Sequence, residues 1–319
     1  MDAIDVKIVA EFFPGDESIR YTSPYAGGNF SCITGDDPAT LKRDKITYQN
    51  LSKVQKSLGG AKCGLDRFVS HEYFATHPSQ EKINSLKSYL DDYEELKDLP
   101  EGYEYGIRFL SWNFNCPLFL KSMMNYLQKK GVEVKRKKLN HIADAYDSDT
   151  IAVVNCSGIG ARSLGGVEDS MVYPTRGQVV VVKAPHILEN RMFWSKDSAT
   201  YVIKRPYSND QMILGGFLQH GDWTPDTLKE QSDDILNRTT KMFPKILSEN
   251  IHGPNIEDLE VLRVVAGLRP SRTGGVRIEK QKFQNKILVH NYGASGYGYQ
   301  SGYAMGQEAA KLALATPKL

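Results

Sequence analysis

The sequence predicts an α/β fold, α+β overall, in which a parallel sheet of the nucleotide-binding kind is interrupted by strand-rich insertions. Short apolar, β-branched runs typical of buried parallel strands occur near the start, in the middle and near the end of the chain, at 6–11, 151–154 and 287–291. Amphipathic helical segments alternate with the strands. The last strand runs into a glycine-rich turn and a helix, an arrangement suited to an anionic ligand.

In the first half of the chain, the strand at Val6–Glu11 ends on a carboxylate, and Pro14 and Gly15 then turn the chain. A glycine-rich loop follows at 24–29. Apolar residues at three- and four-residue spacing predict a helix over 81–98. A second helix should begin at Pro117, a favoured first-turn residue, and end before Gly131.

In the second half, strands dominate. The run at 151–154 opens into a glycine turn at 155–160, which is typical of a parallel strand. A helix is expected over 226–243, because Thr227 and Glu230 have capping-box spacing. The final helix starts near Tyr299. The other expected strands are 178–183, a hairpin-like pair at 201–204 and 211–216, 260–268 and 287–291.

Composition narrows the class of protein. With 319 residues, 40% of them hydrophobic, the chain can form about two domains. A formal net charge of +2 implies neither nucleic acid nor an anionic membrane as a partner. Four scattered cysteines and seven histidines without ligand spacing predict no metal site and no disulfide framework. No signal peptide or span of ~20 apolar residues is evident, so we expect a soluble, reduced protein.

The last three residues, Pro317-Lys318-Leu319, differ by one substitution from the S-K-L peroxisomal address. They predict a peroxisomal enzyme and an import receptor as partner. The alternative is a chance ending on a cytoplasmic protein.

The strongest local signal is the stretch from His290 to Ala313. A strand, a turn with several glycines and a helix N-terminus present free backbone N–H groups and a positive dipole end to a ligand. Gly302 and Gly306 leave one helix face nearly bare, to lie against a sheet or a flat ring. Tight packing alone would explain these two glycines but not Gly293, Gly296 and Gly298.

The second signal is a set of arginines in an apolar run. Arg269 follows Val264, Val265, Ala266 and Leu268, where an unpaired guanidinium is costly to bury. It either forms a bidentate fork for a carboxylate ligand or pairs with one of the acids at 257, 258 and 260.

Taken together, several motifs resemble the D-amino-acid oxidase family in the same order and at similar separations. They are GLRP at 267–270, HNYG at 290–293 with a second glycine cluster behind it, GGxxxxGDW at 215–223, Tyr173–Gln178 and Ser23–Gly27. The joint occurrence of these motifs is far more specific for the family than any single glycine motif. The resemblance runs from Val6 to the last residue.

The resemblance implies an FAD-binding, Rossmann-like domain with an interleaved substrate domain on a mixed or antiparallel sheet. The FAD-binding domain would comprise 1–31, 133–186 and 274–319, and the substrate domain 32–132 and 187–273. The implied reaction is oxidative deamination of a D-amino acid by hydride transfer to FAD, with oxygen as the final acceptor and hydrogen peroxide, ammonia and a 2-oxo acid as products. A homo-oligomer is possible, although the short segment 280–286 argues against the dimer contact formed by a longer insertion in some relatives.

Residue by residue, Arg269 matches the arginine that clamps the substrate carboxylate, Tyr201 the tyrosine that shares it, and Gly296 the carbonyl that accepts from the amine. Glu11 sits where an acid would bind the adenosine ribose; the alternative is an ordinary strand-end charge. The other expected cofactor contacts are Ala26, Gly27, Gly28, Asn29, Ile159, Val179, Ser295, Gly296, Tyr297, Gly298, Tyr299 and Gln300.

Two departures from the family pattern qualify these expectations. The position matching Leu218 is arginine in many D-aspartate oxidases, so an aliphatic residue there predicts neutral substrates. Lys204, Arg205 and His220 are close in sequence and keep D-aspartate oxidation open as an alternative.

The other departure concerns the start of the chain. The family begins with a strand, a G-x-G-x-x-G turn and a helix that hold the FAD pyrophosphate, whereas the strand at Lys7–Ala10 matches the family's second strand. The first βα unit is expected to be absent either because the gene model has lost it or because the chain is a non-catalytic, truncated paralogue unable to hold FAD. We expect the chain as printed to hold FAD poorly.

Overall fold

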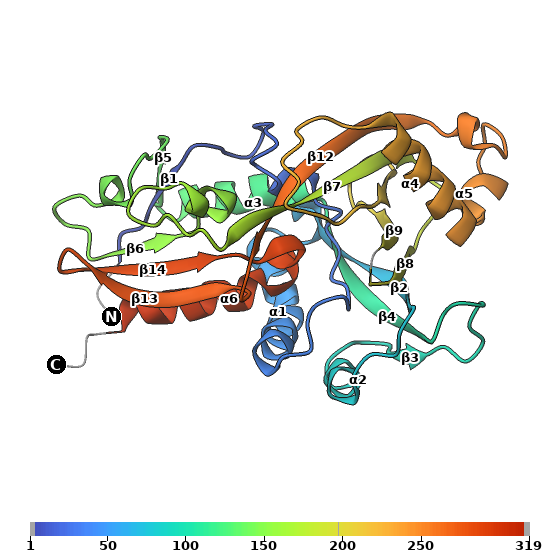
Figure 1. Ribbon diagram of the computed structural model, residues 1–319, viewed down its shortest axis with the longest axis horizontal. Helices are drawn as coiled ribbons and strands as arrows, with labels where there is room; N and C mark the ends of the chain where they lie inside the picture. The colour runs from blue at the N-terminus through green and yellow to red at the C-terminus, as the bar shows by residue number, and fades with distance from the viewer. Residues whose placement is uncertain (1–3, 197, 316–319) are drawn as a thin grey trace.

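The computed structural model describes residues 4–196 and 198–315. One end of the molecule holds small sheets and the long C-terminal helix, and the other holds a large curved sheet with two helices against it (Figure 1). The segments that build each end are far apart in the sequence. The residue boundaries given above for the two domains stay predictions.

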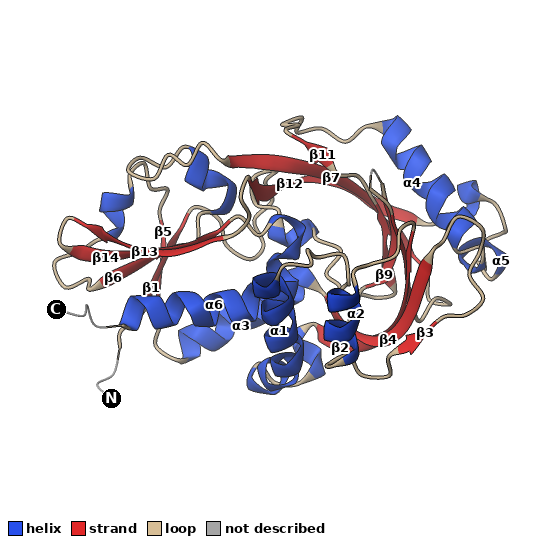
Figure 2. Cartoon of the chain, turned by 60° about the horizontal axis from the view of Figure 1, so that its bottom comes forward, coloured by secondary structure: helices blue, strands red, loops and turns tan. Residues whose placement is uncertain are grey.

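The large sheet has nine strands in the order β11-β7-β10-β9-β8-β2-β4-β3, with β12 pairing with β7. All neighbouring strands are antiparallel except β2 and β8. Figure 2 shows how strongly the sheet curves. Its strands are β2 (Leu65–Phe74), β3 (Glu94–Glu95), β4 (Tyr105–Phe114), β7 (Val172–Lys183), β8 (Asn190–Trp194), β9 (Ala199–Lys204), β10 (Gln211–Gly215), β11 (Gln219–His220) and β12 (Val261–Arg272).

The strands predicted to be parallel lie in two smaller sheets. In one, β6 (Ala152–Asn155) pairs in parallel with β14 (Lys286–Tyr292), which pairs with β13 (Arg277–Phe283). In the other, β1 (Lys7–Ala10) pairs in parallel with β5 (Glu133–Arg136). Within the described residues β1 and β6 each have one unpaired edge.

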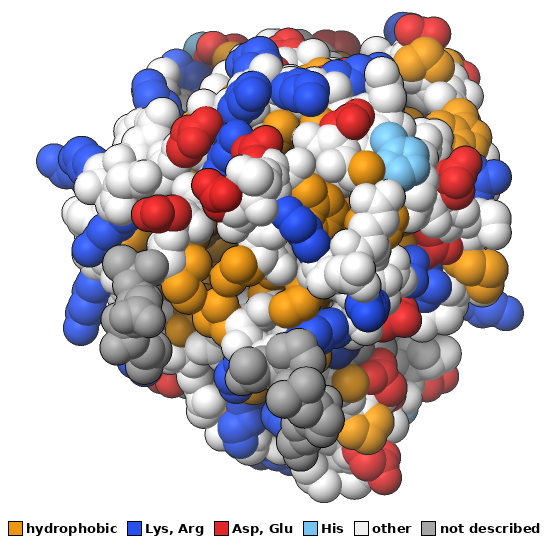
Figure 3. All heavy atoms as spheres, turned by 90° about the vertical axis from the view of Figure 1, so that its left-hand side faces the viewer, with side chains coloured by type: hydrophobic (Ala, Val, Ile, Leu, Met, Phe, Trp, Pro, Cys, Tyr) orange, Lys and Arg blue, Asp and Glu red, His pale blue; other side chains and the backbone are white. Residues whose placement is uncertain are grey.

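Apolar side chains are exposed beside these edges. Val6, at the entry to β1, and Ile151 and Val154, in and before β6, are 41–66% exposed. Figure 3 shows apolar side chains gathered in the middle of the face at this end of the molecule. An exposed strand edge with apolar neighbours is a template for self-association.

The helices pack between and around the sheets. Asp44 of α1 accepts hydrogen bonds from Gln300 and Ser301, which fixes α1 against the first turn of α6. Burial raises the pKa of the Asp44 carboxyl, against the effect of these bonds. The helices are α1 (Pro38–Ser57), α2 (Gln80–Lys87), α3 (Cys116–Lys129), α4 (Lys229–Met242), α5 (Lys245–Ser248) and α6 (Gly298–Leu314).

Most predicted elements are present, but the helix expected over 81–98 is wrong beyond Lys87. Tyr89 and Leu90 are buried in the core, so the apolar periodicity there reflects burial of a turn. Asp92 then adopts a left-handed backbone conformation (φ 54°), and Glu94–Glu95 pair with β4. Strand pairing therefore replaces the last turns of the expected helix.

The expected capping box is also wrong. Helix α4 begins at Lys229 after Leu228, which has no capping side chain. The side-chain oxygen of Gln178, from β7, accepts from the Leu228 N–H at 2.8 Å and takes over that role. The sequence pattern also missed α1, which Asp37 caps by accepting from the Thr40 N–H, and the strand β13.

None of the helices in the described part of the chain is long and apolar enough to cross a membrane.

Candidate active site

A cavity of about 590 Å³ lies where the large sheet meets the N-terminus of α6. Four segments contribute most of its wall: the loop 22–31, strand β9, the middle of β12 and the turn 294–303. This volume is in the range of cofactor and small-molecule sites.

Arg269 projects into the cavity from β12. Its Nη1 donates to the Phe217 carbonyl at 2.8 Å, and its Nη2 lies 3.5 Å from the Tyr201 hydroxyl. The neighbouring arginines are ion-paired, Arg263 with Glu17 and Arg272 with Asp169. Among the described residues no carboxylate pairs with Arg269, so the internal ion pair with an acid at 257–260 is wrong. A guanidinium placed in this way is available to a ligand carboxylate.

Tyr201, on β9, is 7% exposed and lines the same cavity. Its ring lies against Gly215 and Gly216, where any side chain would overlap it. The glycine pair therefore leaves room for the tyrosine and directs its hydroxyl towards Arg269. Two residues 68 positions apart in the sequence thus place a guanidinium and a hydroxyl where both can bind the same carboxylate.

The glycine turn and helix predicted at the C-terminal end form another part of the cavity wall, beside β12. A short 3-10 turn at Ser295–Tyr297 leads directly into α6 at Gly298. A Cβ at Gly298, Gly302 or Gly306 would meet no described atom within 4 Å, so tight packing does not explain these residues. Gly298 and Gly302 face the cavity instead. The bare face leaves room for a flat group.

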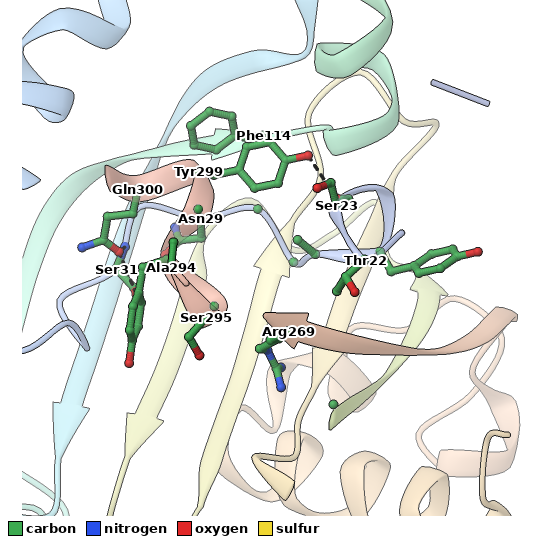
Figure 4. A pocket seen from close by; sticks show the side chains of 18 of the residues that line it. Thr22, Ser23, Asn29, Ser31, Phe114, Arg269, Ala294, Ser295, Tyr299 and Gln300 are labelled. Atoms are coloured by element: carbon green, nitrogen blue, oxygen red, sulfur yellow. Dashed lines mark hydrogen bonds between the residues drawn. The ribbon is translucent and has the colours of Figure 1, made fainter. Parts of the chain in front are cut away.

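The loop that contains Ala26–Asn29 lies beside this wall (Figure 4). Gly28 has a positive φ of 73°, and a side chain there would overlap the Phe114 carbonyl. Asn29 Nδ2 donates to Ser111 and Asn113, whereas its buried Oδ1 has no partner among the described residues. The Tyr299 hydroxyl donates to the Ser23 carbonyl and ties this loop to the first turn of α6.

The cavity therefore gathers most of the residues predicted from the sequence. Glu11 and Ile159 are not among its lining residues: Glu11 lies 3.6 Å from Lys138, and Ile159 is buried in a small cluster with Val172 and Tyr292. The individual roles of all these residues stay predictions. The predicted residues that line it are Ala26, Gly27, Gly28, Asn29, Val179, Tyr201, Arg269, Ser295, Gly296, Tyr297, Gly298, Tyr299 and Gln300.

Sequence reasoning missed an apolar wall formed by Met192, Trp194 and Ala199 beside Leu218. No motif marks these residues, because sheet curvature alone brings them to the cavity. The Trp194 Nε1–H donates to Glu72, a fully buried carboxyl whose pKa is raised to about 7 by burial. Glu72 also accepts from the Cys32 N–H, so it joins the strand that carries Trp194 to the loop beside the cavity.

The charges near Leu218 in sequence do not reach the cavity. Lys204 pairs with Asp210 at 3.2 Å, and Arg205 donates to Gln211 and to the Ala26 carbonyl. In the part of the chain that the structure describes, Arg269 is the only charged side chain that lines the cavity.

Comparison with known proteins agrees with this geometry. Residues 66–312 match the model of a family described as FAD dependent oxidoreductase. The chain is 40% identical to a D-amino-acid oxidase of Schizosaccharomyces pombe over 98% of this chain and 90% of the relative. It is 28% identical to a D-aspartate oxidase of Cryptococcus neoformans, over 96% of this chain and 88% of the relative. The chain belongs to the D-amino-acid oxidase family of FAD-dependent oxidoreductases.

Solved structures share the fold. An L-proline dehydrogenase from P. horikoshii has a TM-score of 0.75 at 13% identity, covering 97% of this chain and 87% of that one. A glycine oxidase from Geobacillus kaustophilus has a TM-score of 0.72 at 17% identity, covering 97% and 88%. At these identities the likeness concerns the fold alone, and it confirms the α/β class expected from the sequence.

FAD is the cofactor of this family, and the cavity fits its flavin ring. Three features are suited to a flat, polar ring: the bare face at Gly298 and Gly302, the Oδ1 of Asn29, which has no partner among the described residues, and the N–H groups at the start of α6. The loop at 26–29 and the turn at 295–300 would hold it.

Proposed function

We propose that this enzyme oxidises D-amino acids with neutral side chains to 2-oxo acids and ammonia, and reduces oxygen to hydrogen peroxide. One observation carries the proposal: among the described residues, Arg269 is the single charged side chain that lines the cavity and has no acidic partner. A substrate with one carboxylate and an apolar side chain complements such a cavity.

Arg269 and Tyr201 would bind the substrate carboxylate together. The guanidinium offers a planar pair of donors and the Tyr201 hydroxyl lies 3.5 Å from it, so both can reach the same two oxygens. The Gly296 carbonyl, in the turn beside Arg269, would accept from the amine. Bound FAD supplies a hydride acceptor for the Cα hydrogen.

Fixed carboxylate and amine positions also explain the handedness. With both groups held and the ring on one side, only one enantiomer directs its Cα hydrogen at the ring. The protein therefore needs no catalytic histidine, cysteine or paired carboxylate for the oxidation step, and orientation is its main contribution.

The apolar wall supports the preference for neutral side chains. Met192, Trp194 and Leu218 offer no donor with which to pair a second carboxylate except the Trp194 N–H, which Glu72 already binds. An acidic side chain would be buried there without a partner. D-Aspartate oxidation, the activity named for the relative from Cryptococcus neoformans, is therefore the weaker candidate.

The proposal is tested with the purified, FAD-loaded enzyme. We expect D-alanine to bleach the flavin spectrum without air and to yield peroxide and pyruvate in air. L-Alanine controls for handedness and D-aspartate for side-chain charge. Turnover of L-alanine, or faster turnover of D-aspartate than of D-alanine, would contradict the proposal.

A further inference from the structure

Four side chains form a continuous hydrogen-bonded chain from the cavity to the protein surface. Ser295 lines the cavity, and its Oγ accepts from Ser271 at 2.8 Å. Ser271 lies 2.7 Å from the Thr175 hydroxyl, which lies 3.1 Å from Nδ1 of His220. Thr175 and Ser271 are at most 3% exposed, whereas His220 is exposed.

The elements that carry these residues come together only in the tertiary structure. Thr175 is on β7, His220 on β11, Ser271 on β12 and Ser295 in the turn before α6. Ser295 has a left-handed backbone conformation, with φ 48°. Figure 4 shows the Ser295 side chain on the same side of the cavity as that of Arg269.

The chain has a direction. Each hydroxyl has one proton to donate. Because Ser271 donates to Ser295, it must accept from Thr175, and Thr175 must then accept from Nδ1–H of His220. All the donors therefore point towards the cavity, and the Ser295 proton is left for an acceptor inside it.

We propose that His220, Thr175, Ser271 and Ser295 form a proton relay that delivers a proton to the cavity when oxygen is reduced. This inference rests on the proposed function. Hydride transfer leaves the flavin with two electrons and one transferable hydrogen. Reduction of oxygen to hydrogen peroxide consumes both electrons, that hydrogen and one further proton.

The further proton arrives by four transfers, one along each of the three hydrogen bonds of the relay and one into the cavity. Ser295 releases its proton to the reduced oxygen and receives one from Ser271, which receives one from Thr175. Thr175 receives its proton from Nδ1 of His220 while Nε2 of the same imidazole takes one up from solvent, so the ring never becomes an anion. Imidazole is suited to this exchange near neutral pH.

Few groups around His220 could replace it. On β7, which pairs with β11, the Tyr173 ring lies 6.2 Å from the imidazole. Arg176 of β7 is engaged by Gln219 and Gln231 through Nη1. Asp222, two residues further on, accepts from the Thr224 N–H. None of these groups is hydrogen-bonded to Thr175 or Ser271.

The test separates the relay from a structural role. Thr175→Val removes the central hydroxyl, and Thr175→Ser keeps it. His220→Asn keeps an N–H close to the position of Nδ1 but cannot exchange a proton. With flavin reduced by light, Thr175→Val and His220→Asn should lower the rate of reoxidation by oxygen about 10- to 100-fold, and Thr175→Ser should react like wild type.

Two further readouts complete the design. Anaerobic reduction by D-alanine should be unchanged in all three variants; no reduction of the wild type would refute the proposed function but not the relay, because light supplies the electrons. NMR of ¹⁵N-labelled imidazole should show the Nδ1–H tautomer of neutral His220. Wild-type reoxidation rates in Thr175→Val and His220→Asn, an equal loss in both half-reactions, or the Nε2–H tautomer would each overturn the relay.

Discussion

Gly177 of β7 and Arg269 of β12 lie against one another across two paired strands, and any side chain at Gly177 would overlap the guanidinium. We therefore expect Gly177→Ala to displace Arg269 from the cavity and to lower kcat/KM for D-alanine by at least about tenfold. The size reflects loss of a charged hydrogen bond of about 1.5–3 kcal/mol. Steady-state kinetics measure it.

The matched control is Gly306→Ala, because a Cβ at that position meets nothing within 4 Å. In the interior of α6 this change should raise the free energy of unfolding by up to about 1 kcal/mol and leave kcat/KM unchanged. If both alanine variants keep full activity, the position of the guanidinium matters less than the geometry indicates.

Arg269→Leu should abolish useful turnover while flavin stays bound. It removes the carboxylate clamp, and the residues expected to hold the cofactor are elsewhere in the cavity wall. The loss in kcat/KM should be about 3 to 5 kcal/mol. Arg269→Lys keeps the charge but not the paired donors, so its kcat/KM should lie between those of the wild type and Arg269→Leu. An active Arg269→Leu variant would refute the assignment.

Leu218→Arg should shift preference towards D-aspartate, because it places a second cation on the apolar wall. The ratio of kcat/KM for D-aspartate to that for D-alanine should rise about 10- to 100-fold, as expected for one charged hydrogen bond. Leu218→Met controls for the change in shape. A wild-type enzyme that already prefers D-aspartate would show that the pocket is not neutral.

Stability should depend on the protonation of Glu72. Burial raises its pKa from 4.5 to about 7, so between these values the native state holds a proton that the unfolded state has lost. The free energy of unfolding should therefore fall as pH rises through this window, by up to about 3 kcal/mol. Urea unfolding at about pH 5 and about pH 8 measures this fall.

Glu72→Gln cannot titrate and should lose less stability over the same interval. Glu101→Gln, at an exposed turn, should behave like wild type. Equal pH dependence in wild type and Glu72→Gln would show that the carboxyl is not held protonated.

Peroxisomal import through Pro317-Lys318-Leu319, which lie outside the described residues, remains a proposal from the sequence. Confinement of an enzyme that makes peroxide gives this tripeptide a rationale. A fluorescent protein fused to the N-terminus should localise to peroxisomes and become diffuse when the three residues are deleted. Unchanged localisation after deletion would count against it.

The sequence by itself determined the parts of this protein whose chemistry is local. Three local features were enough to indicate the fold class, the family, FAD and the roles expected of Arg269 and Tyr201. They are a glycine turn between a strand and a helix, an arginine in an apolar run, and paired motifs in a fixed order. These features depend on backbone freedom, charge and short-range periodicity, which can be identified from the amino-acid sequence alone.

Tertiary structure decided what depends on contacts between distant segments. It ended the helix expected over 81–98 at Lys87 because Glu94–Glu95 pair with β4, and it replaced the expected cap of α4 with Gln178. It left Arg269 without an acidic partner among the described residues. It also brought Trp194 to the cavity wall and aligned His220 with Ser295, since sheet curvature and strand order set these neighbours and no local pattern encodes them.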